Sequence, residues 1–283
     1  MDQVKRLTSP AHREPGSKVV WALVAGLFLL RVPFLGGMRY FTWTRTSAWV
    51  MPIFEVGTYL LTAILIWFER DRLSDSHVDR LALIILVIGK PIELLLSRLR
   101  SPLWRPLGSS AYLLYLPVAI GLLVGLRRSH PRLGKAGAKK WLWVAVGVAT
   151  GVTVGAMSGW LAKMEVGLPS RESLTWRVLA FLPVQQMLYA GIAEEPFFRG
   201  FLWGALRRAG WKDVWVWATQ AGLFWLAHIY WLGHSPMSFW VIVPVGGLVF
   251  GLLAWGSRSI GVSMVAHGLA NGILNVMISY RIS

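Results

Sequence analysis

Long apolar segments recur along the chain, separated by short polar or basic stretches. Each is close to the 20 or so residues that an α-helix needs to cross a hydrocarbon core of roughly 30 Å. Backbone groups inside a bilayer must be hydrogen-bonded within the protein, so such windows predict transmembrane helices. Nine of them occur, near residues 19–35, 49–68, 81–97, 110–126, 141–162, 177–206, 214–232, 240–256 and 259–278.

This pattern predicts an all-α fold, a polytopic transmembrane helix bundle of about nine spans. The first window has a second interpretation, because basic residues precede it as in a signal peptide. However, Arg31 and Pro33 follow its apolar stretch, and no cleavage site of small residues does. We interpret this window as a retained span, with eight spans as the alternative count.

Composition agrees with a membrane protein. Of 283 residues 55% are hydrophobic and 15% are charged, whereas about a quarter are charged in an ordinary soluble domain. The formal net charge of +16 would suggest nucleic-acid binding in a soluble protein. Because the basic residues lie between apolar windows, we expect anionic lipid headgroups as partners and no nucleic acid. The absence of cysteine excludes disulfides, thiolate metal sites and a cysteine nucleophile.

Basic residues predict the orientation in the membrane. The stretch from Arg127 to Lys140 contains six Lys or Arg and no acid, which the positive-inside rule places in the cytoplasm. The N-terminus is then cytoplasmic and the C-terminus lies outside. The same stretch divides the chain into an N-terminal membrane region, residues 1–140, with about four spans and no assigned role, and a second region, residues 141–283, with five.

Several ionisable residues inside the windows have structural explanations. Such a residue must be paired, face water or serve a function. Lys90 and Glu93 are three apart on one helix and can neutralise each other. Glu55 follows Pro52 near the start of its window, and Arg31 lies near the end of its own. We expect Glu55 and Arg31 to reach the interface.

Two adjacent carboxylates, Glu194 and Glu195, lie deep in the sixth window. Glu195 and Arg199 are four apart, so their side chains can meet on one helical face. Glu194 points about 100° away and has no local partner, which makes it a candidate general base. Pro196 cannot donate a backbone hydrogen bond and is expected to bend or open the helix beside the acids.

Polar residues on two further windows can meet these carboxylates. His228 lies in the seventh window, and His267 and Asn271 lie one turn apart in the ninth. Taken singly, a buried histidine is more often a hydrogen-bonded core residue than a catalyst. At 1.5 Å per residue, however, Glu194, His228, His267 and Asn271 all lie about 12 to 21 Å from the cytoplasmic ends of their helices. A shared polar site near the bilayer midplane is therefore predicted.

Three motifs in this order resemble those of one family, the type II CAAX prenyl endopeptidases and their bacterial relatives in the CAAX protease and bacteriocin-processing family. These are intramembrane proteases of glutamic type. The Glu-Glu-x-x-x-Arg motif is present at Glu194–Arg199, Phe-x-x-x-His at Phe224–His228, and His-x-x-x-Asn at His267–Asn271. The resemblance covers roughly residues 175–280 and identifies 141–283 as a CAAX-protease-like catalytic membrane core. The first four or five windows resemble no family that we can name.

The resemblance implies an intramembrane endopeptidase in a bacterial cytoplasmic membrane. Its substrate would be a membrane-anchored protein or peptide, cleaved by a glutamate-activated water. By analogy, Glu194 takes a proton from the water, which His228 helps to hold. Glu195 is held by Arg199, and both His267 and Asn271 stabilise the oxyanion.

Other chemistry stays open on sequence alone. His228, His267 and the glutamates could form a His-His-Glu zinc site, although the chain has no His-Glu-x-x-His signature. We expect a metal-free mechanism with no cofactor, and zinc is the alternative. A non-catalytic membrane immunity or assembly factor could retain the same fold. A transporter could also combine a Pro-broken helix with midplane acids, but no inverted repeat supports it. Nothing in the sequence indicates the oligomeric state.

Overall fold

The computed structural model describes residues 16–35, 47–99, 108–134, 139–166, 172–173, 176–233 and 235–281. The N-terminal region consists of helices α1 (Gly16–Leu29), α2 (Val32–Leu35), α3 (Ser47–Phe68), η3 (Leu73–Ser76), α4 (Arg80–Arg98), η4 (Ser110–Leu114) and α5 (Tyr115–Ser129). The basic residues before Gly16 and within 135–138 lie outside the described residues.

The second region begins with α6 (Lys140–Val166). It continues with α7 (Trp176–Gln186), η5 (Met187–Gly191), α8 (Ile192–Glu195), η6 (Pro196–Phe201), α9 (Leu202–Arg208), α10 (Asp213–Leu226), η7 (Ile229–Gly233), η8 (Ser238–Ile242), α11 (Val243–Ser257) and α12 (Ile260–Ser279). Two short strands, β1 (Glu172–Ser173) and β2 (Tyr280–Arg281), pair in parallel beside the end of α12.

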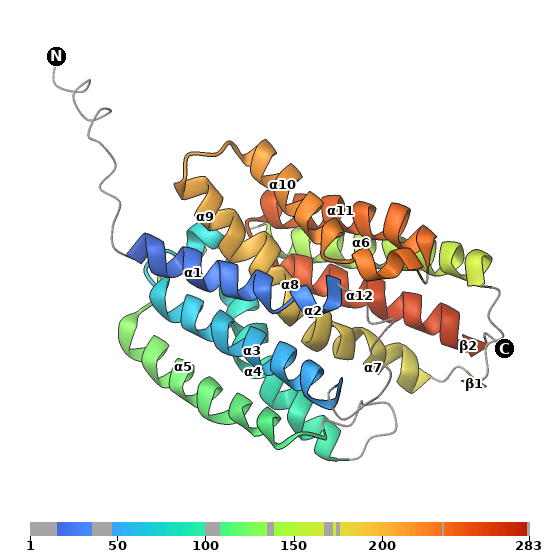
Figure 1. Cartoon of the computed structure of the whole chain (residues 1–283), viewed down its shortest axis with the longest axis horizontal. Coiled ribbons are helices and arrows are strands. Elements are labelled where there is room, and N and C mark those ends of the chain that lie inside the picture. The colour runs from blue at the N-terminus through green and yellow to red at the C-terminus, as the bar shows by residue number, and fades with distance from the viewer. Residues whose placement is uncertain are drawn as a thin grey trace.

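All nine predicted windows are helical, and the long helices lie side by side in one bundle (Figure 1). Within the described residues, five helices are long and apolar enough to cross a membrane, namely 49–68, 110–129, 140–165, 238–257 and 260–278. Helix α1 is apolar but shorter, α4 contains both Lys90 and Glu93, and the sixth window is broken into short helical pieces. The fold is helical as predicted, but a count of about nine spans is not established.

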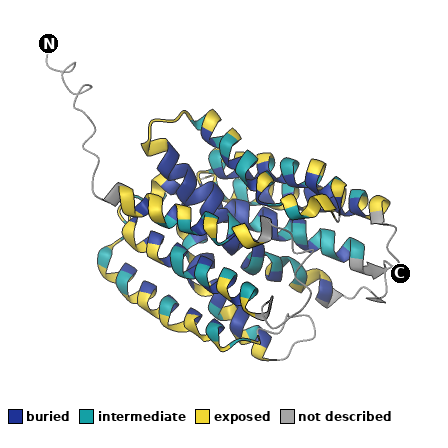
Figure 2. Cartoon of the chain, viewed as in Figure 1, coloured by how far each residue is buried: buried dark blue, intermediate teal, exposed yellow. Residues whose placement is uncertain are grey.

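The hydrophobic core extends through both regions. Buried residues from α1, α3, α4 and α5 form one cluster with residues from η6, α9, α10 and α12. Figure 2 shows these buried positions along the inner faces of the helices and exposed positions on the outer faces. Large apolar side chains are among the exposed ones, for example Trp141 and Leu99. An apolar exterior around a packed interior is what a hydrocarbon solvent requires.

Glycines bring α6 close to α12. Gly147, Gly151, Gly155 and Gly159 recur at every fourth position of α6, and all of them face α12. A Cβ atom on Gly151 would lie 2.6 Å from the carbonyl oxygen of Ala266, a contact that no larger residue could make without moving a backbone. Small residues four apart allow membrane helices to approach in this way. The contact fixes α12, the helix that carries His267.

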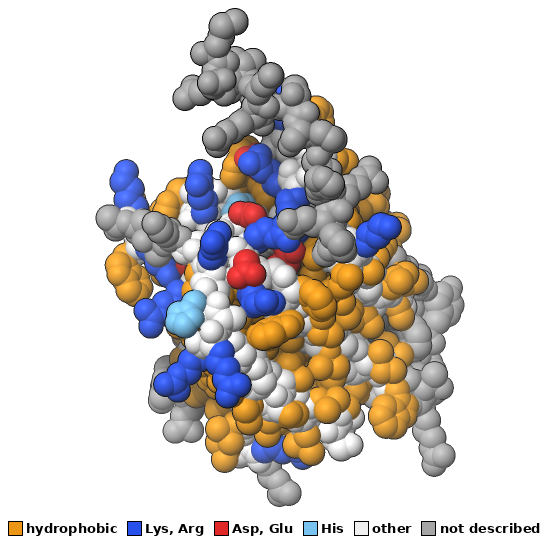
Figure 3. Space-filling model, turned by 90° about the vertical axis from the view of Figure 1, so that its left-hand side faces the viewer, with side chains coloured by type: hydrophobic (Ala, Val, Ile, Leu, Met, Phe, Trp, Pro, Cys, Tyr) orange, Lys and Arg blue, Asp and Glu red, His pale blue; other side chains and the backbone are white. Residues whose placement is uncertain are grey.

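Four connecting segments meet at one end of the bundle, and we call this the basic end. The segments are residues 69–79, 130–134, 209–212 and 258–259. The backbone N–H of Ser74 donates to the carbonyl of Arg132 (3.2 Å), and that of Ile260 donates to His77 (2.9 Å). Figure 3 shows Lys and Arg side chains gathered on this face with a few acids among them. The alternation of apolar windows in the sequence predicts that these four segments lie on one side of the membrane.

Candidate active site

The predicted site lies on a helix with two widened turns. From Trp176 to Arg208 the chain is continuously helical, but η5 and η6 are π-helical turns on either side of the four-residue helix α8. Pro196 begins η6 and has no N–H to donate to the carbonyl of Ile192. Single π-helical turns occur frequently at functional sites. Pro196 thus leaves the carbonyl of Ile192 without its usual helical donor, close to Glu194 and Glu195 at the end of α8.

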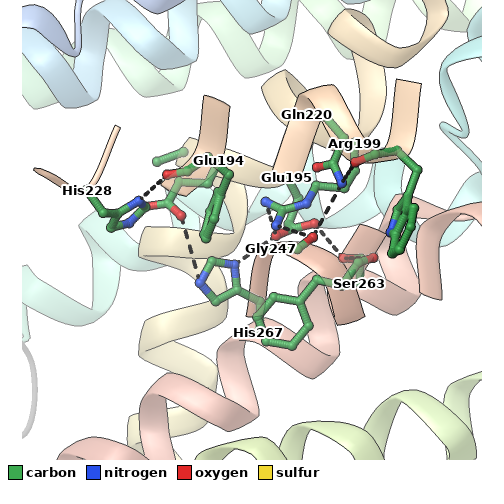
Figure 4. Close-up of polar contacts among 12 residues, drawn as sticks. Glu194, Glu195, Arg199, Gln220, His228, Gly247, Ser263 and His267 are labelled. Atoms are coloured by element: carbon green, nitrogen blue, oxygen red, sulfur yellow. Dashed lines mark hydrogen bonds and ion pairs between the residues drawn. The ribbon is translucent and has the colours of Figure 1, made fainter. Parts of the chain in front are cut away.

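Glu195 lies at the centre of a buried polar network (Figure 4). Its side chain and that of Arg199 are both fully buried, and Arg199 Nη1 lies 3.2 Å from Glu195 Oε1. The same oxygen lies 2.8 Å from Nδ1 of His267, while the hydroxyl of Ser263 donates to Oε2. Glu195 is therefore an ionised, fully partnered carboxylate that orients an imidazole.

Arg199 is held on its other sides by α10 and α11. Its guanidinium carbon lies 4.0 Å from the centroid of the Phe224 ring, and Nη2 donates to the carbonyl of Gly247 at 3.4 Å. Gln220 also donates to Gly247, at 3.3 Å. A carboxylate, a carbonyl oxygen and a ring face together compensate the burial of this guanidinium better than one ion pair alone.

Glu194 differs from its neighbour, because its side chain is 19% exposed and is not paired with a guanidinium. Its Oε1 lies 3.7 Å from Nε2 of His228, and its Oε2 lies 3.9 Å from Nε2 of His267. Both distances exceed a direct hydrogen bond. Glu194 thus faces two imidazoles from two other helices.

Hydrogen bonds fix the orientation of both imidazoles. The Nδ1 atom of His228 lies 2.7 Å from the carbonyl oxygen of Phe224, which can only accept, so Nδ1 carries the proton. Nδ1 of His267 likewise donates to the carboxylate of Glu195. In each neutral ring the lone pair is therefore on Nε2, the atom that faces Glu194. The phenylalanine of the Phe-x-x-x-His motif holds the histidine through its backbone.

Asn271 is the sixth predicted site residue, and it lies apart from this network. It is half-buried on α12, one turn beyond His267. No hydrogen bond joins it to the other site residues in the described part of the chain. Its predicted role at an oxyanion depends on a bound substrate.

Two expectations about buried charge are wrong. Arg31 does not reach the interface: it is 4% exposed, and its guanidinium donates to the carbonyl of Ala193, next to Glu194. Glu55 is also buried, and its Oε2 lies 3.6 Å from Lys90 Nζ. The predicted pair of Lys90 and Glu93 is confirmed, at 2.6 Å.

Zinc has limited support from the donor geometry. Among the described residues, no three His, Asp or Glu side chains are grouped as a metal ion would require. His267 uses one ring nitrogen for Glu195, which leaves Nε2 as its free donor. Zinc therefore stays the alternative to a metal-free mechanism, and chelation can test it.

Apolar helices long enough to span a membrane surround this buried cluster, which defines an integral membrane protein with an internal polar site. Residues 175–273 match the family model described as Rce1-like, type II CAAX prenyl endopeptidase Rce1-like. The resemblance of the motifs is therefore confirmed, and this segment is similar to the Rce1-like domain of a protease family. Neither the curated proteins nor the solved structures include a match to the chain.

Proposed function

We propose that this chain is an intramembrane endopeptidase that hydrolyses a peptide bond of a membrane-anchored substrate with a water activated by Glu194. One observation carries the proposal. Of the two adjacent acids, Glu195 is fully partnered, whereas Glu194 is partly open and faces two imidazole nitrogens at 3.7 and 3.9 Å. A base must be accessible to water and free to accept a proton, and Glu194 is the acid of this pair that meets both needs.

In the proposed reaction, a water held between Glu194 and His228 attacks the carbonyl carbon of the scissile bond. The water gives one proton to Glu194 as its oxygen bonds to that carbon, and the carbonyl oxygen becomes an oxyanion. Glu194 then returns the proton to the leaving nitrogen as the carbon–nitrogen bond breaks. The products are a carboxylic acid and an amine, and the site regains its starting charge.

His267 and Asn271 are proposed to stabilise the oxyanion. His267 would donate to the developing charge from Nε2 in its doubly protonated form, which takes its second proton from water before the substrate binds and keeps Nδ1–H on Glu195. On the other side of the ring, Nδ1–H of the imidazolium contacts Glu195, which is itself paired with Arg199. Preorganised donors of this kind, removed one at a time, typically cost 10²- to 10³-fold in rate.

The position of the site selects the kind of substrate. Glu194 lies on a helix within the bundle, roughly 20 Å by helix rise from the end of α9 at Arg208. A folded soluble protein cannot bring its chain to that depth, so the substrate has to be extended and carry a hydrophobic anchor. The basic end is proposed to face the cytoplasm and to hold anionic headgroups, with a bacterial cytoplasmic membrane as the location.

The test uses the full chain in lipid vesicles and two internally quenched peptides. One ends in a farnesylcysteine followed by three residues, as the family description suggests, and the other has serine in place of the farnesylcysteine. We expect cleavage of the farnesylated peptide, at least tenfold slower cleavage of the serine peptide, and cleavage by Glu194→Gln that is slower by about 10²-fold or more. Activity near the wild-type level in Glu194→Gln would remove Glu194 as the base.

Chelation separates the two mechanisms. We expect the wild-type chain to keep its activity after treatment with a strong chelator and to contain less than one zinc per chain. Activity that is lost on chelation and restored by added zinc would overturn the metal-free mechanism while leaving the protease assignment intact.

A further inference from the structure

Arg31 is the buried charge that the proposed reaction does not yet use. It follows α1, in the short turn between α1 and α2, and belongs to the region outside the family match of residues 175–273. Its side chain is 4% exposed. Arg31 is 15 residues from Gly16 at the start of α1, which puts it roughly 22 Å along that helix. This depth is close to that of Glu194 when both are measured from the basic end.

The contacts of Arg31 point to the segment that carries the two glutamates. One guanidinium nitrogen donates to the carbonyl of Leu27 on its own helix, and the other donates to the carbonyl of Ala193 on α8. The guanidinium carbon lies 4.6 Å from the centroid of the Phe197 ring and 5.4 Å from that of Phe198, both in η6. One side chain thus touches both the helical turn before Glu194 and the π-helical turn after Glu195.

Burial of this charge needs compensation. Within the described residues, no carboxylate forms an ion pair with Arg31, whereas Lys90 pairs with two carboxylates and Arg199 with one. Carbonyl oxygens and ring faces supply part of the compensation. Ala193, whose carbonyl accepts from Arg31, directly precedes Glu194, the acid that lacks a guanidinium partner. A buried cation without an ion pair is energetically costly. Its position next to an acid of the site therefore points to a function.

We propose that Arg31 is a positioning residue for Glu194. It bonds the Ala193 carbonyl in the short helix between two π-helical turns, and so fixes the direction of the Glu194 carboxylate toward His228 and His267. Its positive charge also stabilises the ionised carboxylate that has to accept a proton. The N-terminal region thereby supplies part of the site, and α2 also packs against η7, the segment after His228. This role rests on the proposed hydrolytic function.

The test compares Arg31→Met, Arg31→Lys and the control Arg98→Met in vesicles. The control removes an exposed arginine in the last turn of α4, at the end of that helix opposite the basic end. With the farnesylated peptide, we expect Arg31→Met to lower kcat about 10- to 100-fold and to leave KM within about twofold, because misplacement by 1 Å can cost 10²-fold. Arg31→Lys should regain part of kcat, since it keeps the charge but cannot donate to two carbonyls as well as a guanidinium can. Arg98→Met should leave both kcat and KM unchanged.

Hydrogen exchange of the backbone amides tests the same role without any substrate. In Arg31→Met we expect faster exchange in residues 192–201 and unchanged exchange in α5. If the wild-type chain cleaves neither peptide, the proposed function fails, but the exchange experiment still decides whether Arg31 holds this segment. Unchanged exchange in residues 192–201, or a kcat for Arg31→Met within twofold of wild type, would overturn the positioning role. Faster exchange across the whole chain would show a general loss of packing, which also contradicts it.

Discussion

Two buried ionic clusters, one in each region of the chain, contain the same basic ingredients in different arrangements. The N-terminal cluster consists of Glu55, Lys90 and Glu93, all no more than 6% exposed. The ammonium of Lys90 lies 2.6 Å from Glu93 and 3.6 Å from Glu55, so one cation faces both acids. In the second cluster Arg199 pairs with Glu195, and Glu194 is left to two imidazoles.

The difference separates a structural cluster from a reactive one. Acids that share a cation and are sealed from water stabilise the packing of α3 against α4, and nothing frees them to exchange protons. An acid with 19% exposure that faces two imidazoles and has no ion pair with a guanidinium or ammonium can exchange a proton with a bound water. The two clusters are similar in burial and charge. They differ in the exposure of Glu194 and in the kind of side chain that faces it.

The largest expected effect tests this distinction directly. Glu194→Gln should reduce the cleavage rate by about 10²- to 10⁴-fold, because the amide keeps the volume of the side chain but cannot act as a base. Glu55→Gln, the matched change in the N-terminal cluster, should keep the rate within about threefold, since Lys90 retains Glu93 as a partner. Initial rates with the farnesylated peptide measure both. Equal losses in the two variants would show that the clusters do not differ in function.

The second effect concerns stability. Lys90→Met should destabilise the fold by about 3 to 5 kcal/mol, because it leaves two buried carboxylates without a cation. Chemical denaturation in detergent measures this change. The triple variant Lys90→Met/Glu55→Gln/Glu93→Gln should recover much of the lost stability, since all three charges are then removed.

Activity in the triple variant completes the comparison. Each folded molecule of this variant should cleave at nearly the wild-type rate, because the N-terminal cluster takes no part in the reaction. A stable triple variant without activity would instead show that the N-terminal cluster contributes to the site.

Contacts within one helix could be predicted from the sequence, whereas those between helices could be predicted only in part. The spacing of Glu195 and Arg199, and of Lys90 and Glu93, determines that each pair shares a helical face, and both pairs form. Depth along the helices also predicted that Glu194, His228 and His267 lie at one level. The burial of Arg31 and Glu55 could not be predicted, because it depends on how each helix is rotated toward its neighbours.

Two further features had signals in the sequence. The four glycines at every fourth position of α6 predict a close helix contact, and they bring α6 against α12. Ser263 precedes His267 by four residues, so both lie on the same face of α12 and both reach Glu195. The widened turns on either side of α8 were predicted only as a bend at Pro196, because Pro196 removes one donor but does not determine how the neighbouring turns adjust.

The smallest expected effect comes from Ser263, the hydroxyl partner of Glu195. Its side chain is fully buried, and Ser263→Ala leaves Glu195 Oε2 without a donor while Arg199 and His267 still hold Oε1. The lost hydrogen bond should destabilise the fold by about 1 to 3 kcal/mol. Cleavage should slow by only a few fold, since the imidazole of His267 keeps its bond to Glu195.

Ser97→Ala is the matched control, because its buried hydroxyl donates to the carbonyl of Leu94 in its own helix and lies in the N-terminal region. That control should lose less stability and no activity. A loss of activity in Ser263→Ala as large as that in Glu194→Gln would mean that Glu195 takes part in proton transfer itself, and the division of labour between the two adjacent glutamates would then be wrong.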